Sequence, residues 1–434
     1  MSNDSRPVVS IIVPARNEEA SLAACLQSLI AQTGIDYEII VVDDDSTDRT
    51  AEIALSFTNK AGVAVDEEIG LDATDYDTTG KGTASSPAEN DLDKTNGTAG
   101  SRALPASVSF GGDEPPASTG VRVRPAVHLI SALPLPANWT GKNNAMAAGA
   151  PVAKGKWLLF TDADTVHKPG SLARAVAEAE EHGADLLSYS PEQEVRAFWE
   201  KAIMPVIFAE LATTYPPQAV NDPASPIAAA NGQYLIISRE AYDAVGGHAA
   251  IADNLLEDVA MARLVKSTGR KIFFRYGGDA VRTRMYRSWA QMKEGWTKNL
   301  ALLFPHPIAL ALLRSAEFVL ILANAVIVVW AGLSGRSNLA LQSSLLTIIL
   351  AGWFWMRIRK AHFPAGSSLI AICGLPIFAY LLLRSASSRR NHSVNWKGRQ
   401  YGKTPDTPGV HDLHGNLSSD RRVAVGSRMG ARRR

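Results

Sequence analysis

The sequence predicts an α/β fold: a doubly wound domain of alternating strands and helices, followed by transmembrane helices near the C-terminus. Short β-branched runs alternate with amphipathic segments over residues 8–58 and again over residues 126–190. Such alternation is typical of a parallel sheet covered by helices on both faces. Three late apolar runs, at 318–333, 339–356 and 367–383, each approach the roughly 20 residues that a helix needs to cross a bilayer.

The first domain is expected to contain strands and helices in regular order. The expected strands are 8–13, 37–42, 126–131, 156–160 and 184–190, and the expected helices are 18–32, 48–57, 142–154 and 169–182. Segment 196–214 mixes apolar and aromatic positions, so it fits a membrane-surface helix or a core helix. Segment 288–303 carries apolar residues at spacings of three and four with lysines between them, which favours a helix at the bilayer interface.

Residues 59–124 differ in composition from the segments around them. They are rich in Gly, Ser, Thr, Ala, Pro and acidic residues and show little periodicity, so a disordered insertion or long loop is expected. The predicted organisation is a domain over 1–300 with its insertion at 60–124, a membrane region over 301–390 with two to three spans, and a basic tail over 391–434.

Charge and cysteine content restrict the setting of the protein. The formal net charge is +1, which gives no global basic field for nucleic acid, and none is expected as a partner. The two cysteines, Cys25 and Cys373, form no disulfide or zinc framework. Because the polar N-terminus runs straight into a strand without a signal peptide, the first domain is expected in the cytoplasm, attached to the inner membrane by several spans.

The basic segments conflict with three full crossings. If all three apolar runs cross, residues 357–360 lie inside but the basic tail lies outside, which the positive-inside rule disfavours. A re-entrant or interfacial third run, broken by Gly374 and Pro376, would keep both basic segments inside. Buried core helices are the other explanation of these runs.

Two acidic clusters are the strongest local signal. Asp43-Asp44-Asp45-Ser46 and Asp162-Ala163-Asp164 each directly follow an apolar strand, so both are expected at the carboxyl edge of the sheet. Carboxylate oxygens are the ligands that hold Mg²⁺ or Mn²⁺ against a diphosphate. Ordinary turn and N-cap chemistry is the alternative for each cluster alone.

These clusters belong to an ordered set of motifs. The set comprises Val9-Ser-Ile-Ile-Val-Pro-Ala-Arg-Asn-Glu-Glu19, the Asp43 cluster, Trp139-Thr-Gly-Lys142, Asp162/Asp164, Asn231-Gly-Gln-Tyr234, Gly246-Gly-His248, Leu256-Glu-Asp258, Arg284-Met-Tyr-Arg-Ser-Trp289 and Trp396-Lys-Gly-Arg399. In this order the chain resembles the family 2 glycosyltransferases, and most of all their membrane-bound hopanoid-associated and carotenoid glycosyltransferase branch. The resemblance covers about residues 8–58, 126–301 and 393–401.

The resemblance implies a GT-A nucleotide-sugar-binding domain that transfers a sugar with inversion of the anomeric centre. The implied donor is a nucleotide sugar, most readily a UDP-sugar, and the implied acceptor is a membrane lipid of hopanoid or carotenoid type. It places the donor on Pro14, Glu18, Asp43, Asp45, Lys142 and Asp162. Asp164 would bind Mg²⁺ or Mn²⁺, and Asp258 would be the catalytic base. Glu257, Arg284, Arg287 and Trp289 would contact the acceptor and the diphosphate.

Several alternatives remain open at this point. Lys142 could be a solvent-facing lysine at a helix start, and Glu257 and Asp258 could simply open a helix and interact with its dipole. Arg284 stands where the family has Gln, so a basic cluster at the membrane edge is a rival, and an interfacial anchor explains Trp396-Lys-Gly-Arg399 equally well. A processive polysaccharide synthase and a catalytically silent membrane scaffold are the rival functions.

Overall fold

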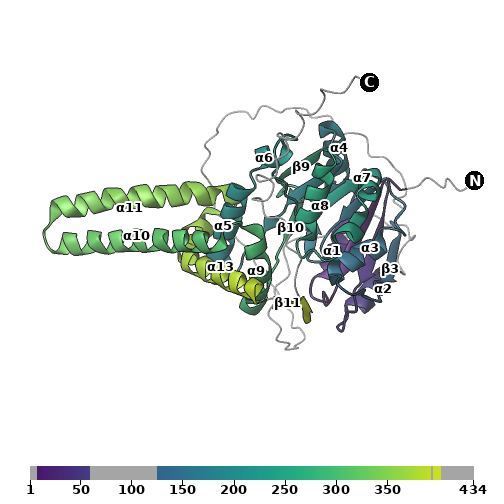
Figure 1. Ribbon diagram of the computed structural model, residues 1–434, viewed down its shortest axis with the longest axis horizontal. Helices are drawn as coiled ribbons and strands as arrows, with labels where there is room; N and C mark the ends of the chain where they lie inside the picture. Colours follow the sequence, from purple (N-terminus) through teal and green to yellow (C-terminus); the bar gives the residue numbers. More distant parts are fainter. Residues whose placement is uncertain (1–6, 59–124, 392–393, 402–434) are drawn as a thin grey trace, which may run out of the picture. The chain divides into compact units, whose positions relative to one another are not determined.

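The computed structural model describes residues 7–58, 125–391 and 394–401 (Figure 1). The predicted insertion at 60–124 and most of the predicted tail at 391–434 lie outside the described residues.

The domain is built on a seven-stranded sheet. Its strand order is β3-β2-β1-β4-β8-β6-β9. The strands are β1 (Val9–Ala15), β2 (Tyr37–Asp43), β3 (Val127–Ser131), β4 (Trp157–Phe160), β6 (Leu186–Ser190), β8 (Leu235–Ser238) and β9 (Ile272–Tyr276). The sheet is mixed rather than parallel, because β8 runs antiparallel to both β4 and β6. The expected strands lie within one or two residues of the observed ones, whereas β8 and β9 were not predicted.

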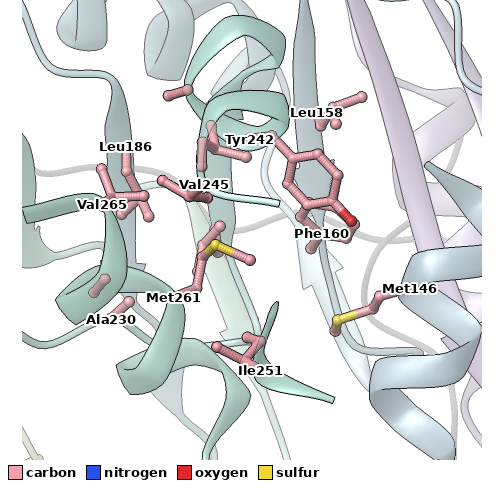
Figure 2. Close-up of a cluster of buried hydrophobic side chains, with 14 of the residues drawn as sticks. Met146, Leu158, Phe160, Leu186, Ala230, Tyr242, Val245, Ile251, Met261 and Val265 are labelled. Atoms are coloured by element: carbon pink, nitrogen blue, oxygen red, sulfur yellow. The ribbon is translucent and has the colours of Figure 1, made fainter. Parts of the chain in front are cut away.

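Both faces of the sheet are covered because alternate residues of its strands point to opposite sides. On β1, Ile11 belongs to a first apolar cluster, with residues of α1 (Leu22–Ile30) and α4 (Ser171–His182). Ile12 points to the other face and belongs to a second cluster, with residues of α3 (Gly141–Gly149) and α8 (Glu257–Ser267). Figure 2 shows this second cluster, in which Met146, Phe160 and Met261 meet between helix and sheet. Helices α2 (Thr50–Thr58), α6 (Pro217–Asn221), α7 (Arg239–Ala244) and η1 (Gly247–Ile251) complete the domain.

Two smaller sheets lie outside the main one. β10 (Val281–Thr283) pairs antiparallel with β5 (Thr165–His167) and parallel with β7 (Glu192–Gln193). Near the C-terminus, β11 (Val394–Trp396) and β12 (Arg399–Tyr401) form an antiparallel hairpin. None of these short strands was predicted from the sequence.

Three helical segments of the C-terminal region are long and apolar enough to cross a membrane. Helices α10 (Pro307–Leu333) and α11 (Ser337–Ile358, continued by η2, Arg359–Ala361) lie side by side (Figure 1). Their apolar windows are each 11% buried within the protein, whereas the third, formed by α12 (Ala365–Ile370), η3 (Ala371–Cys373) and α13 (Gly374–Arg390), is 50% buried. Packing against protein therefore accounts for much of the hydrophobicity of the third segment.

Helix α13 packs on α5 (Phe198–Thr214), α9 (Trp289–Leu303) and α10. Ile203, Val206 and Ile207 of α5 are fully buried, so segment 196–214 is a core helix and not a membrane-surface helix. The apolar face of α9 also packs on protein: Trp296 and Leu300 are buried with residues of α5 and α13. The interfacial position expected for α9 did not take these partners into account, because α5 precedes α9 and α13 follows it, each by more than 70 residues.

Four charged side chains join α5 to the α10–α11 pair. Arg314 of α10 lies 2.9 Å from Glu210 of α5 and 2.8 Å from Glu317, while Arg357 of α11 lies 3.1 Å from Glu210 and 2.8 Å from Glu317. All four side chains are at least 84% buried, because the largest exposed fraction among them is 16%. The two cations and two anions balance each other, which makes their burial tolerable.

The contact between α13 and α5 leads to a packing prediction. A Cβ added at Gly374 would overlap the carbonyl oxygen of Ala202 on α5, so Gly374→Ala should separate the two helices and destabilise the protein by about 1–3 kcal/mol. Gly352→Ala on α11 is the matched control, because a Cβ there meets no atom within 4 Å. Thermal unfolding in detergent should show a lower Tm for Gly374→Ala alone, and equal Tm values would contradict this account of the packing.

Candidate active site

A cavity of about 940 Å³ opens at the carboxyl edge of β1 and β4. The chain turns away from the sheet at this edge, so side chains from neighbouring strands converge there. Of the predicted site residues, the cavity is lined by Pro14, Glu18, Lys142, Asp162, Asp164, Glu257, Asp258, Arg284 and Arg287.

Lys142 lies at the centre of this cluster. Thr140 caps α3 by accepting a hydrogen bond from the backbone N–H of Asn143 at 3.1 Å, which places Lys142 in the first turn. The ammonium Nζ of Lys142 lies 2.6 Å from Asp162 Oδ1 and 2.6 Å from Glu257 Oε1. The side chain thus joins the end of β4 to the start of α8 and is not the solvent-facing lysine of the alternative interpretation.

Asp164 lines the cavity with a carboxylate that the protein leaves partly unpaired. Its Oδ1 atom is buried without a hydrogen-bond partner. Burial, and next the charges of Asp162 and Glu18, raise the pKa of Asp164 to about 8. A divalent cation would satisfy the unpaired oxygen and stabilise the charged carboxylate. No group of three His, Cys, Asp or Glu side chains within the described residues could hold a metal alone, so a bound ion would need ligands from a substrate or water.

Asp258 lies in the first turn of α8, after the N-cap residue Leu256. Its Oδ2 accepts a hydrogen bond from the Gly232 N–H at 2.9 Å, and its Oδ1 accepts one from the Val259 N–H at 2.7 Å. Burial and the adjacent Glu257 charge raise the pKa of Asp258 to about 6. This carboxylate is therefore held in one position, and its pKa is raised well above that of an ordinary Asp.

The first acidic cluster is arranged differently from the expectation. Asp43 and Asp45 do not line the cavity, whereas Asp44, which was not selected, does. Asp43 Oδ1 accepts the Ser46 N–H at 3.4 Å, as in ordinary turn chemistry. Asp45 has a φ of 60°, and its 55% exposed side chain lies 3.6 Å from Arg16. The turn after β2 directs Asp44 inward, where it is buried.

The Arg284-Met-Tyr-Arg-Ser-Trp289 motif is only partly at the cavity. Arg284 lines it but pairs with the buried Glu200 at 3.0 Å, and Arg287 donates to the Ala20 carbonyl at 3.0 Å. Trp289 does not line the cavity; its ring packs edge-on to Trp199, with 6.3 Å between centroids.

The β11–β12 hairpin contributes residues that the sequence reasoning did not assign to the site. Lys397 Nζ lies 2.5 Å from Glu18 Oε1, and the Arg399 guanidinium pairs with the Asp44 carboxylate. Lys397 and Gly398 form the two-residue turn, both with positive φ, as the twist of a tight hairpin requires. The signal was present in Trp396-Lys-Gly-Arg399, but an interfacial anchor explained that motif equally well.

Comparisons with known proteins identify the family. The family described as "Glycosyl transferase family 2" matches residues 10–68 and 124–246. The 4,4'-diaponeurosporenoate glycosyltransferase of Staphylococcus aureus strain USA300 is 24% identical over 416 residues, covering 92% of this chain and 89% of that protein. This chain therefore contains a family 2 glycosyltransferase domain. The predicted family and enzyme class are confirmed, and the long match to an enzyme named for a carotenoid acid agrees with the predicted branch.

Solved structures similar to this glycosyltransferase include a mannosyltransferase from Pyrobaculum calidifontis in complex with GDP-Man and Mn²⁺. That structure is 14% identical, with a TM-score of 0.42, and covers 89% of this chain and 87% of its own. Staphylococcus aureus TarS, residues 1–349, in complex with UDP-GlcNAc is 13% identical with a TM-score of 0.35, covering 92% of this chain and 97% of its own.

The bridge at Lys142 gives a stability prediction for the glycosyltransferase. Lys142→Met should leave Asp162 and Glu257 without their shared cation and lower the free energy of unfolding by about 2–3 kcal/mol. This is less than for a fully buried pair, because the Lys142 side chain is 31% exposed. Lys154→Met is the control, because Lys154 is exposed and its side chain forms no ion pair among the described residues. Chemical denaturation should separate the variants, and equal stability would show that the bridge is not structural.

Proposed function

We propose that this glycosyltransferase moves a sugar, with inversion, from a nucleotide sugar to a lipid acceptor of carotenoid or hopanoid type. The observation that carries the proposal is the composition of the cavity. Its wall includes the carboxylates Asp162, Asp164 and Asp258 and also the apolar side chains Phe208, Leu211, Met285 and Leu303. A polar donor and an apolar acceptor can therefore meet in one enclosed space.

The donor side is formed by the loop after β1, by Asp44 and by the Asp162–Asp164 turn. Pro14, Glu18 and Asp44 would contact the nucleoside, with a UDP-sugar as the first candidate, and Asp162 the ribose or sugar. Asp164 would hold Mg²⁺ or Mn²⁺, whose charge would offset the negative charge that develops on the departing diphosphate. The unpaired Oδ1 of Asp164 supports this assignment.

Asp258 would act as the general base. Its carboxylate accepts the proton of the acceptor hydroxyl while that oxygen attacks the anomeric carbon. The bond between the anomeric carbon and the phosphate oxygen breaks on the opposite side, and the nucleoside diphosphate leaves with the bonding electron pair. A single displacement of this kind inverts the anomeric centre and forms no covalent sugar intermediate. The two backbone N–H groups fix the carboxylate for this task.

The acceptor would reach Asp258 from the membrane. The apolar cavity residues Phe208 and Leu211 belong to α5, which also binds α10 and α11 through Glu210. The cavity wall and the foot of the membrane hairpin thus share one helix. A lipid acceptor is also supported by the Staphylococcus aureus relative, whose name refers to a carotenoid acid.

The same contacts support a membrane arrangement with two crossings. Helix α10 follows α9 of the catalytic domain, and α11 returns to that domain at Arg357. The β11–β12 hairpin beyond α13 binds Glu18 and Asp44, so it lies on the same side as the catalytic domain. These contacts are compatible with an arrangement in which α10 and α11 cross the membrane and α13 packs against the catalytic domain without crossing. This arrangement also keeps both basic segments on the cytoplasmic side, as the positive-inside rule requires.

The deciding test of the function is incubation of membranes that contain the protein with labelled nucleotide sugars and extracted lipids. Label in the lipid fraction is the expected result. Label in insoluble polymer would indicate a processive synthase, and no transfer or hydrolysis of any donor would indicate a silent scaffold.

Asp258→Asn should retain donor affinity but slow transfer by roughly 10²–10⁴-fold, because the amide cannot accept a proton. In the unmodified enzyme the rate should rise with pH through about 6, since below that pH Asp258 already carries a proton. Single-turnover transfer and nucleotide binding measured on the same variant test this. Near-normal transfer would refute the base, because Asn supports a helix start about as well as Asp.

Asp164→Ala should abolish transfer and the response to added Mn²⁺ or Mg²⁺ while leaving thermal stability nearly unchanged. The side chain makes no hydrogen bond through Oδ1 that the fold would lose. Transfer and melting temperature should be compared with and without chelator. Full activity of the unmodified enzyme in excess chelator would remove the metal from the mechanism.

The arrangement with two crossings predicts a labelling pattern. In a Cys373→Ser background, Ser334→Cys at the far turn between α10 and α11 should react with a membrane-impermeant maleimide in intact cells. Ser387→Cys, exposed near the end of α13, should react only after lysis. Labelling of Ser387→Cys in intact cells would show that α13 crosses the membrane.

A further inference from the structure

Lys298 of α9 is a cation of the cavity that the mechanism above does not use. It lines the cavity and is partly buried. No carboxylate of the described residues lies within the 4.0 Å of an ion pair from its ammonium group. The ammonium group lies over the ring of Trp396, with 4.7 Å between Nζ and the ring centroid.

The other cations of the cavity differ from Lys298. Lys142, Lys397 and Arg399 each pair with a carboxylate, as do Arg16 and Arg284 in the same wall. Arg287 and Lys360 have no carboxylate partner in the described part of the chain, but both are exposed, so water solvates their charges. Lys298 alone among these described cations combines partial burial with an unpaired charge.

The contact with Trp396 holds the ammonium group without neutralising it. A cation over an indole face is attracted by the ring quadrupole, and the positive charge remains available to an anion. The hairpin that carries Trp396 is fixed to the same helix, because the Lys397 N–H donates to Glu294 Oε1 of α9 at 3.2 Å. Lys298 is thus positioned by its contact with Trp396 before any ligand binds, which reduces the entropy cost of binding.

The electrostatic surroundings place Lys298 near the reacting groups. Burial and the charge of Lys142 lower the pKa of Lys298, whereas Glu257, Asp258 and Asp162 oppose that effect. Of these carboxylates, Asp162 is proposed to contact the ribose or sugar, and Asp258 the acceptor hydroxyl. A bound anion would stabilise the ammonium form more strongly than these more distant carboxylates do.

We propose that Lys298 is an anion-binding residue of the catalytic cavity and takes an oxyanion, either the diphosphate of the donor or the carboxylate of an acidic lipid acceptor. This inference rests on the proposed function and refines its substrate class. Both ligands offer the same chemistry to the ammonium group: a charged oxygen for a charge-assisted hydrogen bond. The charged oxygen belongs to the donor in the first case and to the acceptor in the second.

The experiment measures binding, not transfer, with the full-length protein in detergent. The anionic probes are UDP, GDP and retinoate. Each is compared with a neutral counterpart that lacks the anionic group: uridine, guanosine and retinol, respectively. The variants are Lys298→Met and Lys298→Arg. Lys293→Met on the same helix is the matched control, because Lys293 does not line the cavity. Melting temperatures check that every variant is folded.

Loss of the ammonium group should weaken binding of one anionic probe by about tenfold or more, the usual scale of a hydrogen bond to a charged group. A loss for the nucleoside diphosphates, but not the nucleosides, assigns the site to the donor, and a loss for retinoate, but not retinol, assigns it to the acceptor. Lys298→Arg should retain most of the affinity.

Two results would overturn the proposal. Equal affinities in Lys298→Met and the unmodified protein would show that Lys298 binds no anion, and equal losses for charged and neutral probes would show a structural role. Both results leave the proposed function standing. If the unmodified protein binds neither nucleoside diphosphates nor retinoate, the proposed function fails together with this inference.

Discussion

The ammonium group of Lys142 is the interaction on which the arrangement of the active site depends. Asp162 from the end of β4 is partly buried and Glu257 from the start of α8 is buried, and each lies 2.6 Å from that ammonium group. Without a cation between them, two carboxylates would repel each other across the cavity. With it, α8 is held against the sheet edge, and Asp258 is placed beside Gly232. An added Cβ at Gly232 would lie 3.0 Å from both Lys142 Nζ and Glu257 Oε1, so a larger residue there would displace the side-chain ends that form this bridge.

The second organising feature is the return of the chain to the cavity after the apolar helices. Helix α13 packs on α5 and α9, and the β11–β12 hairpin then brings Lys397 to Glu18 and Arg399 to Asp44. Residues separated by more than 350 positions in the sequence thus form one wall. The apolar helices are consequently part of the architecture of the active site.

The sequence alone predicted the main strands, most helices and the acidic residues at the carboxyl edge, because periodic apolar patterns and strand-end carboxylates are local signals. It did not predict β8, since three apolar residues followed by a serine are too short a signal for a strand and carry no information on its direction. Asp44 was missed because one residue with positive φ, Asp45, decides which carboxylate of the cluster points inward. The pairing of Arg399 with Asp44 depends on tertiary contacts that no local pattern contains, and the burial of α9 and α13 depends on partners far away in the chain.

The charged group formed by Glu210, Arg314, Glu317 and Arg357 has a geometric consequence. These contacts join two helices to α5, and a slip of one helical turn, about 5.4 Å, would break all of the pairs between them at once. Phe208 and Leu211, neighbours of Glu210 on the same helix, belong to the cavity wall. If α10 and α11 stand in a bilayer, the group fixes the height of the cavity above the lipid. The length of an acceptor would then decide whether it can react. Its reactive end must extend from the membrane surface to the cavity while the rest of the molecule remains among the acyl chains.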